Sequence, residues 1–74
     1  MQEIGKFQKN ALEIIKAQTG EYNNRPVIDF RVWVENQEGK FIPTKKGLTF
    51  SPGNLKDFFE LVKKVYEQQE KKDK

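Results

Sequence analysis

Arg31 and Trp33 stand two residues apart in the run from Val27 to Val34, and their side chains suit contact with nucleic acid. Side chains of a strand alternate between its two sides, so Asp29, Arg31 and Trp33 would share one side. A flat aromatic ring beside a fixed cation suits a stacked base and its phosphate. We therefore predict that this pair lies on the open surface of a sheet and forms the centre of a binding surface.

A purely structural interpretation of the same pair stays open. Trp33 would then cover an ordinary hydrophobic patch, and Arg31 would pair with Asp29 or Glu35. The residues on the other side of this strand, from Ile28 to Val34 in steps of two, are all apolar and predict a core face.

Further cations and aromatic residues extend the candidate surface. Lys45 and Lys46, directly before Gly47, would flank a phosphate track, although adjacent lysines are also typical of a solvated turn. Lys6, Lys9 and Lys16 would extend this basic surface if residues 3–18 form a strand. Phe7, Tyr22 and Phe41 are additional candidates for stacking, with packing in a core or loop as the alternative. The predicted nucleic-acid contacts are Trp33, Arg31, Lys45, Lys46, Lys6, Phe7, Lys9, Tyr22, Arg25 and Phe41.

The composition argues against catalysis. The chain has 74 residues, no Cys and no His, and a net charge of +3 from 14 basic and 11 acidic residues. Disulfides, zinc fingers, thiol nucleophiles and a histidine base are therefore excluded. The sequence has no phosphate-binding glycine pattern, and the carboxylates of Asp57 and Glu60 fall on a solvated side. We expect a protein that is not an enzyme and has no metal or cofactor.

The sequence also predicts a cytoplasmic, nucleoid-associated protein. No apolar run approaches the roughly 18 residues that a membrane span needs. The first residues lack the basic start and apolar stretch of a signal peptide. The absence of Cys fits a reducing compartment.

The segments alternate between extended runs and turns. Residues 27–35 form the clearest strand, residues 40–42 and 48–50 are shorter ones, and residues 3–18 permit either a strand or an amphipathic helix. Residues 19–26 and 36–39 have the composition of turns, with Gly39 able to take positive φ, and Lys45 to Gly47 resembles another turn. Pro43 suggests an edge or a bend.

A helix is predicted from Pro52 to about Gln69, with Ser51 as its N-cap. Its apolar residues form a stripe wider than the ~100° that covers one sheet. The excess apolar surface predicts a homodimer, since a second copy is the simplest partner for it. The predicted dimer contacts are Phe58, Leu61, Val62 and Val65.

These elements define an α+β domain. We expect a curved four-stranded antiparallel sheet followed by one C-terminal helix (ββββα), with the helix on the apolar face of the sheet and the other face open. Residues 1–70 would form this single domain, and residues 71–74 a charged flexible tail.

The run from Asp29 to Pro52 resembles the positive cofactor four (p15) transcriptional coactivators. The shared pattern is Asp-x-Arg with a nearby aromatic residue, then Glu38-Gly39, a proline, a basic pair with glycine, a short strand and a Ser-Pro helix start, without gaps. Ile4-Gly5-Lys6 resembles the family's opening strand.

This resemblance implies a homodimer of ββββα subunits that binds single-stranded DNA on the outer surface of the sheet. By position, Arg31, Lys45, Lys46 and Lys6 would be the cationic contacts. Eukaryotic members place their stacking Trp at the position of Val34, whereas bacterial-looking relatives have it at that of Trp33. The alternation of side chains along the strand puts Trp33 beside Arg31 and so favours Trp33 as the stacking residue. The longer segment between Lys6 and Asp29 prevents a transfer of the family's loop aromatic to Tyr22. Purine-rich-element binding repeats and whirly proteins have a similar order of elements.

The sequence therefore predicts a non-catalytic single-stranded DNA-binding protein of low sequence specificity that serves transcription regulation, replication or repair, with transcription or replication proteins as further partners. Two alternatives remain: a module that docks a partner protein on the open sheet, and a binder of single-stranded RNA.

Overall fold

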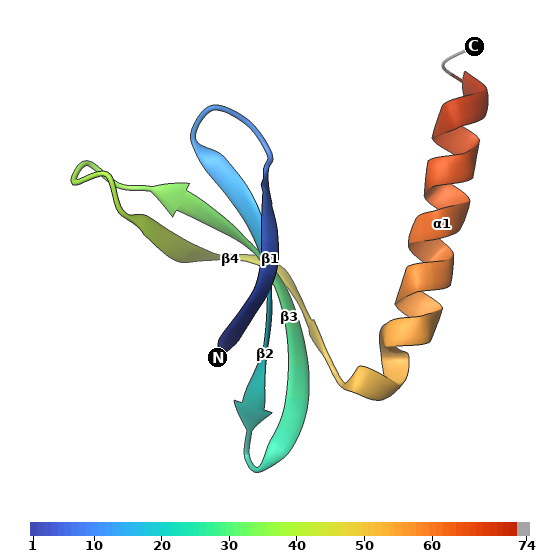
Figure 1. Ribbon diagram of the computed structural model, residues 1–74, viewed down its shortest axis with the longest axis horizontal. Helices are drawn as coiled ribbons and strands as arrows, with labels where there is room; N and C mark the ends of the chain where they lie inside the picture. The colour runs from blue at the N-terminus through green and yellow to red at the C-terminus, as the bar shows by residue number, and fades with distance from the viewer. Residues whose placement is uncertain (73–74) are drawn as a thin grey trace.

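The sheet is a meander in which each strand pairs with the next one along the chain (Figure 1). A computed structural model describes residues 1–72, and side chains as far as residue 70. The strands are β1 (Gln2–Gln8), β2 (Glu13–Tyr22), β3 (Arg25–Glu35) and β4 (Phe41–Phe50), and all neighbours are antiparallel. Residues 3–18 therefore form two strands joined by a short connection at residues 9–12, and not the amphipathic helix that the sequence left open as the alternative.

Two tight turns fix the register of the central strands. Asn23 and Asn24 alone connect β2 to β3, with φ of 53° and 64°. Two consecutive positive φ values characterise the turn that matches the twist of a hairpin, and asparagine tolerates them. The predicted loop over residues 19–26 is thus mostly strand. The predicted turn before β4 is confirmed: Gly39 has φ 80°, and the side chain of Asn36 accepts bonds from the backbone N–H groups of Glu38 and Lys40.

The register divides the sheet into two faces, because residues paired across strands point to the same side. The polar face carries Glu3, Lys6, Gln8, Ile14, Lys16, Gln18, Asp29, Arg31, Trp33 and Thr49. The apolar face carries Phe7, Ile15, Ala17, Ile28, Phe30, Val32, Val34, Ile42, Leu48 and Phe50. This is the alternation that the sequence predicted for β3.

A bulge interrupts β4 where the sequence predicted a turn. Arg31 pairs with Gly47 and Trp33 with Pro43, so residues 44–46 stand opposite Val32 alone. The hydroxyl of Thr44 donates to the carbonyl of Val32 over 2.8 Å and so holds the bulge against β3. The run Lys45 to Gly47 is therefore an irregular part of a strand rather than a separate connection.

The helix stands away from the sheet instead of covering it, which corrects the expected packing on the apolar face (Figure 1). A short 3-10 helix, η1 (Pro52–Asn54), leads into α1 (Leu55–Lys72), and the hydroxyl of Ser51 makes no capping bond. Phe58 of α1 packs against the sheet, with its ring centroid 5.2 Å from those of Phe30 and Phe50. α1 passes the predicted end at Gln69, and residues 73–74 of the predicted tail lie outside the described residues.

A single chain buries very little. Among the described side chains, only Ile14 and Asp29 are buried, at 5% and 2% exposure. The helix stripe is open: Phe59 is 64% exposed, Leu61 60% and Val65 54%. Ordinarily a helix contributes to stability by burying such a stripe. Within one chain that contribution is largely missing here.

Candidate nucleic-acid interface

Arg31 and Trp33 lie on the same face of β3, as the sequence predicted. Lys16 of β2 is directly opposite Arg31, and Ile14 is directly opposite Trp33. Lys6 of β1 continues the row of Arg31 beyond Lys16. Three cations from three neighbouring strands therefore lie in one row across the sheet.

The guanidinium of Arg31 is held by protein groups. Its Nε donates to one carboxylate oxygen of Asp29 over 3.2 Å and its Nη2 to the other over 2.8 Å. Nη1 donates to the carbonyl of Thr44 over 2.8 Å, and Nη2 also lies 3.4 Å from the hydroxyl of Thr49. That hydroxyl itself donates to Asp29 over 2.8 Å. Four of the five guanidinium N–H donors are thus engaged, which leaves one Nη1 donor for a ligand.

This network links β3 to β4 at the bulge. The carboxylate of Asp29 is buried, whereas the side chain of Arg31 retains 27% exposure. A buried carboxylate is stable as an ion only when it is paired and hydrogen-bonded. The pairing of Arg31 with Asp29, foreseen as the structural interpretation, is present. The partners on β4, Thr44 and Thr49, were not foreseen because only the register of the strands brings them there.

Trp33 is half-buried rather than fully open, and its ring carries a cation. The Nζ of Lys16 lies 3.8 Å from the centroid of the indole. The indole Nε1 is buried and has no hydrogen-bond partner among the described residues. The indole is therefore neither sealed in a core nor freely displayed on the sheet.

Lys16 connects Trp33 to the edge of the sheet. Its ammonium forms an ion pair with the carboxylate of Glu3 on β1, at 3.3 Å, and only 14% of its side chain is exposed. The sequence placed Lys16 only in a general basic surface. Its position over the indole depends on a diagonal contact between β2 and β3, for which the sequence contains no signal.

The other predicted cations differ in whether they are exposed or paired with a carboxylate. Lys6, Lys45 and Lys46 are exposed, the last two within the bulge of β4. Lys9 instead pairs with Glu13 at 2.9 Å. Hydrogen bonds from the side chains of Asn10 and Lys9 hold the pKa of Glu13 below its usual range.

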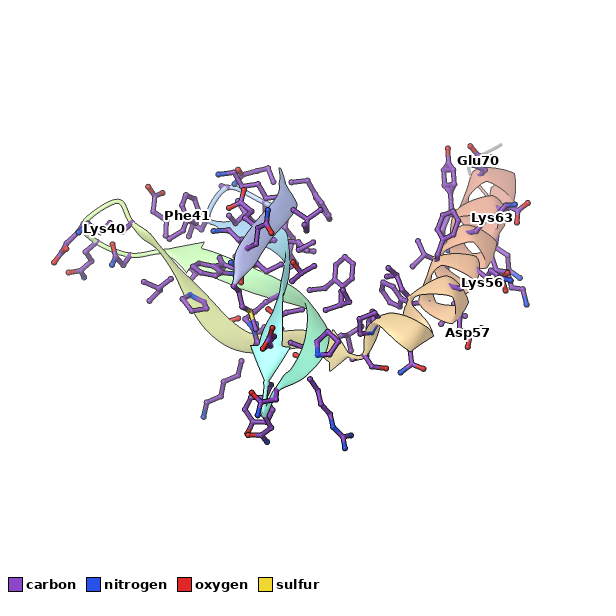
Figure 2. All side chains as sticks on the ribbon, turned by 60° about the horizontal axis from the view of Figure 1, so that its bottom comes forward. Lys40, Phe41, Lys56, Asp57, Lys63 and Glu70 are labelled. Atoms are coloured by element: carbon purple, nitrogen blue, oxygen red, sulfur yellow. The ribbon has the colours of Figure 1, made fainter. Side chains whose placement is uncertain are left out.

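The predicted aromatic contacts lie in different parts of the sheet. Tyr22 and Arg25 face each other across the β2–β3 hairpin, at the opposite end of β3 from Trp33. Phe41 lies at the start of β4, next to Lys40 and near the Trp33 end (Figure 2). Phe7 pairs with Ile15 and so lies on the apolar face, on the other side of the sheet from Trp33.

The predicted dimer contacts lie on the open side of α1, apart from one. Leu61, Val62 and Val65 are exposed, whereas Phe58 is half-buried against Phe30 and Phe50. Lys56 and Lys63, labelled on the helix in Figure 2, lie on its other side.

Within residues 1–72 no cluster of three or more potential metal ligands is found. No helix in the part of the chain that the structure describes is both long enough and apolar enough to cross a membrane.

Comparison with solved structures finds close likeness in fold. Two crystal forms of a PC4 homologue from Burkholderia pseudomallei match with 26% identity and TM-scores of 0.83 and 0.82. Each match covers 88% of this chain, and 88% and 96% of the respective chains. A bacteriophage T5 homologue of the eukaryotic coactivator, implicated in recombination-dependent DNA replication, matches in fold with TM-score 0.73 and 18% identity, over 93% of this chain and 80% of its own.

A search of the curated proteins finds no match. The family described as Transcriptional Coactivator p15 (PC4) matches residues 9–61, which include β2, β3, β4 and the start of α1. The match covers more than half of the sequence and agrees with the resemblance carried by Asp29 to Pro52. The chain belongs to the Transcriptional Coactivator p15 (PC4) family.

Proposed function

We propose that this chain is a non-catalytic protein that binds single-stranded DNA, with low sequence specificity, on the polar face of its sheet. The observation that carries the proposal is the half-buried indole of Trp33, two residues along β3 from Arg31 and so beside the row of cations formed by Lys6, Lys16 and Arg31. Stacking on an aromatic ring accepts any base, and lysines follow the phosphate backbone without reading sequence. In this role the protein acts on DNA in the cytoplasm, at the nucleoid, in transcription regulation, replication or repair.

The lysines of the β4 bulge would extend the phosphate track beyond the central row. Lys45 and Lys46 are exposed beside the strand that carries Arg31 and Trp33. Tyr22 and Arg25 offer a second aromatic–cation pair on the same face, at the far end of the hairpin. A strand of DNA laid along β3 would thus meet an aromatic ring near each end of the sheet.

We further propose that two copies associate through their uncovered apolar surfaces. Within residues 1–72, much of the apolar face of the sheet and most of the stripe of α1 are uncovered, and Leu61 and Val65 are more than half exposed. Apolar surface of this extent typically marks an interface. Sedimentation equilibrium at micromolar concentration should give twice the chain mass of 8.7 kDa. A mass of one chain would refute the dimer.

A titration with oligo-dT tests the binding role. Trp33 is the only tryptophan, so its emission should change on binding. The apparent affinity should fall with salt, by about 0.7 logarithmic units per tenfold change for each phosphate neutralised. Unchanged emission and no binding at low salt would refute the proposal.

The same titration separates the alternatives. Competition by oligo-U equal to that by oligo-dT would indicate that RNA is an equivalent ligand. No oligonucleotide binding, with a purified transcription or replication protein bound instead and released by substitutions on the sheet, would favour the protein-docking role.

A further inference from the structure

Glu3 of β1, Lys16 of β2 and Trp33 of β3 form a cluster in which the lysine lies over the indole, and we call this cluster the clasp. The Nζ of Lys16 lies 3.8 Å from the Trp33 ring centroid and 3.3 Å from the Glu3 carboxylate. Neither contact is between directly opposed residues, since Lys16 pairs with Arg31 and Glu3 with Gln18. The lysine therefore lies diagonally across the polar face, between the indole and the acid.

The clasp and a stacked base compete for the same space. A base that stacks on an aromatic ring sits within a few ångströms of that ring. An ammonium 3.8 Å from the centroid occupies this space on one side of the indole. On that side of Trp33, a base can stack only after Lys16 has moved.

Lys16 is held by fewer protein groups than Arg31, the cation directly opposite it. Arg31 is fixed by Asp29 and by two groups of β4. Among the described residues, the ammonium of Lys16 contacts a ring face and a carboxylate that is 43% exposed on the edge strand β1. A lysine has a long flexible side chain with a compact charge, so its ammonium can pass from Glu3 to a phosphate and remain paired.

We propose that Glu3, Lys16 and Trp33 form a closed state of the stacking site, and that single-stranded DNA opens it by exchange. A base takes the place of the ammonium on the ring, and Lys16 pairs with the phosphate of the same strand. Glu3 thereby limits affinity, because it stabilises the closed state and repels the phosphate. This inference rests on the proposed function and assigns Glu3 and Lys16 their parts in it.

The free protein provides a first test that needs no DNA. Opening the clasp should expose the indole, so acrylamide should quench Trp33 more strongly in Glu3→Gln and Lys16→Gln than in the wild type. Glu21→Gln is the matched control, because Glu21 is exposed in the same sheet, pairs with Pro26 and contacts neither Lys16 nor Trp33. Circular dichroism confirms folding. Quenching identical in Glu3→Gln, Lys16→Gln and the control would overturn the clasp.

Binding to oligo-dT provides the second test. Glu3→Gln should bind about two- to fivefold more tightly than Glu21→Gln, the range expected for loss of one ion pair that is partly open to solvent. Lys16→Gln should reduce the slope of log affinity against log salt by about 0.7, whereas Lys63→Gln, the same charge change on the helix, should not.

The outcomes distinguish the two proposals. Failure of the wild type to bind oligo-dT overturns the proposed function and, with it, the exchange. Binding by the wild type with Glu3→Gln equal to Glu21→Gln overturns the closed state alone. An unchanged salt slope in Lys16→Gln overturns the transfer of Lys16 to a phosphate.

Discussion

The guanidinium of Arg31 holds both carboxylate oxygens of Asp29, at 2.8 and 3.2 Å, from two residues further along the same strand. The pair bridges to Thr44 and Thr49 on β4, so it connects two strands beside the bulge. The first role of this ion pair is therefore to fix the strands that display Trp33 and the lysines of the bulge.

Replacement of Asp29 by Asn should destabilise the fold. The change leaves the Arg31 charge without its carboxylate, and breaking a buried pair costs about 3–5 kcal/mol. Because Arg31 is partly exposed, we expect about 2–4 kcal/mol. Urea unfolding at a fixed protein concentration measures this loss. Glu38→Gln, which neutralises an exposed turn residue, should change stability by less than about 0.5 kcal/mol.

Replacement of Trp33 by Ala should weaken oligo-dT binding by about 1–3 kcal/mol, the range measured for one base–aromatic stack. Fluorescence anisotropy of a labelled oligonucleotide measures this without the intrinsic tryptophan signal. Trp33→Phe keeps an aromatic face and should retain most of the affinity. Equal losses of affinity in Trp33→Ala and Trp33→Phe would show that the ring does not act by stacking.

Gly47 should not tolerate a side chain. A Cβ there would lie 2.9 Å from Cα of Arg31 and would also meet the carbonyl of Phe30, so backbone would have to shift. Overpacking of this kind costs about 1–3 kcal/mol, which thermal unfolding would detect for Gly47→Ala. Gly5→Ala is the matched control, because a Cβ at Gly5 meets nothing within 4 Å. Equal losses at the two positions would point to a general cost of replacing strand glycines.

The lowered pKa of Glu13 predicts a pH dependence of the loop between β1 and β2. Hydrogen bonds from Asn10 and Lys9 favour the ionised carboxylate in the folded chain. Its contribution to stability is therefore present above the unfolded-state pKa and is lost as the pH falls through the folded-state value. Asn10→Ala should raise the pKa of Glu13 towards its ordinary value, as seen in an NMR titration of its carboxyl carbon. An unchanged titration would exclude Asn10 as the main cause.

A charge on the open stripe of α1 should prevent association. Val65→Glu should shift the sedimentation mass towards one chain of 8.7 kDa, because the new carboxylate would have to be desolvated in the proposed interface. Lys64→Gln changes the net charge equally on the neighbouring residue, and it should leave the mass unchanged. A dimer that persists in Val65→Glu would place the interface elsewhere.

Local patterns predicted much of this fold. Strict alternation identified β3 and both of its faces, and Asn36 with Gly39 identified the turn before β4. The gapless match from Asp29 to Pro52 predicted the family, which the comparisons confirm.

What the sequence could not provide depends on contacts between distant segments. Lys45 and Lys46 have the composition of a turn, yet pairing with β3 draws them into a bulged strand. The contact of Lys16 with Trp33 follows from strand register, which no local pattern encodes. The predicted position of α1 on the sheet was wrong. An apolar stripe indicates that a helix will be covered, but it does not identify the surface that covers it.

The scarcity of buried side chains in one chain has a thermodynamic consequence. With Ile14 as the one buried apolar side chain among those described, an isolated subunit has little to offset its conformational entropy. If association supplies the missing interior, folding becomes bimolecular, and the melting temperature should rise as the protein is concentrated. Subunits would then exchange only as fast as they unfold, so mixed oligomers of tagged and untagged chains should form slowly.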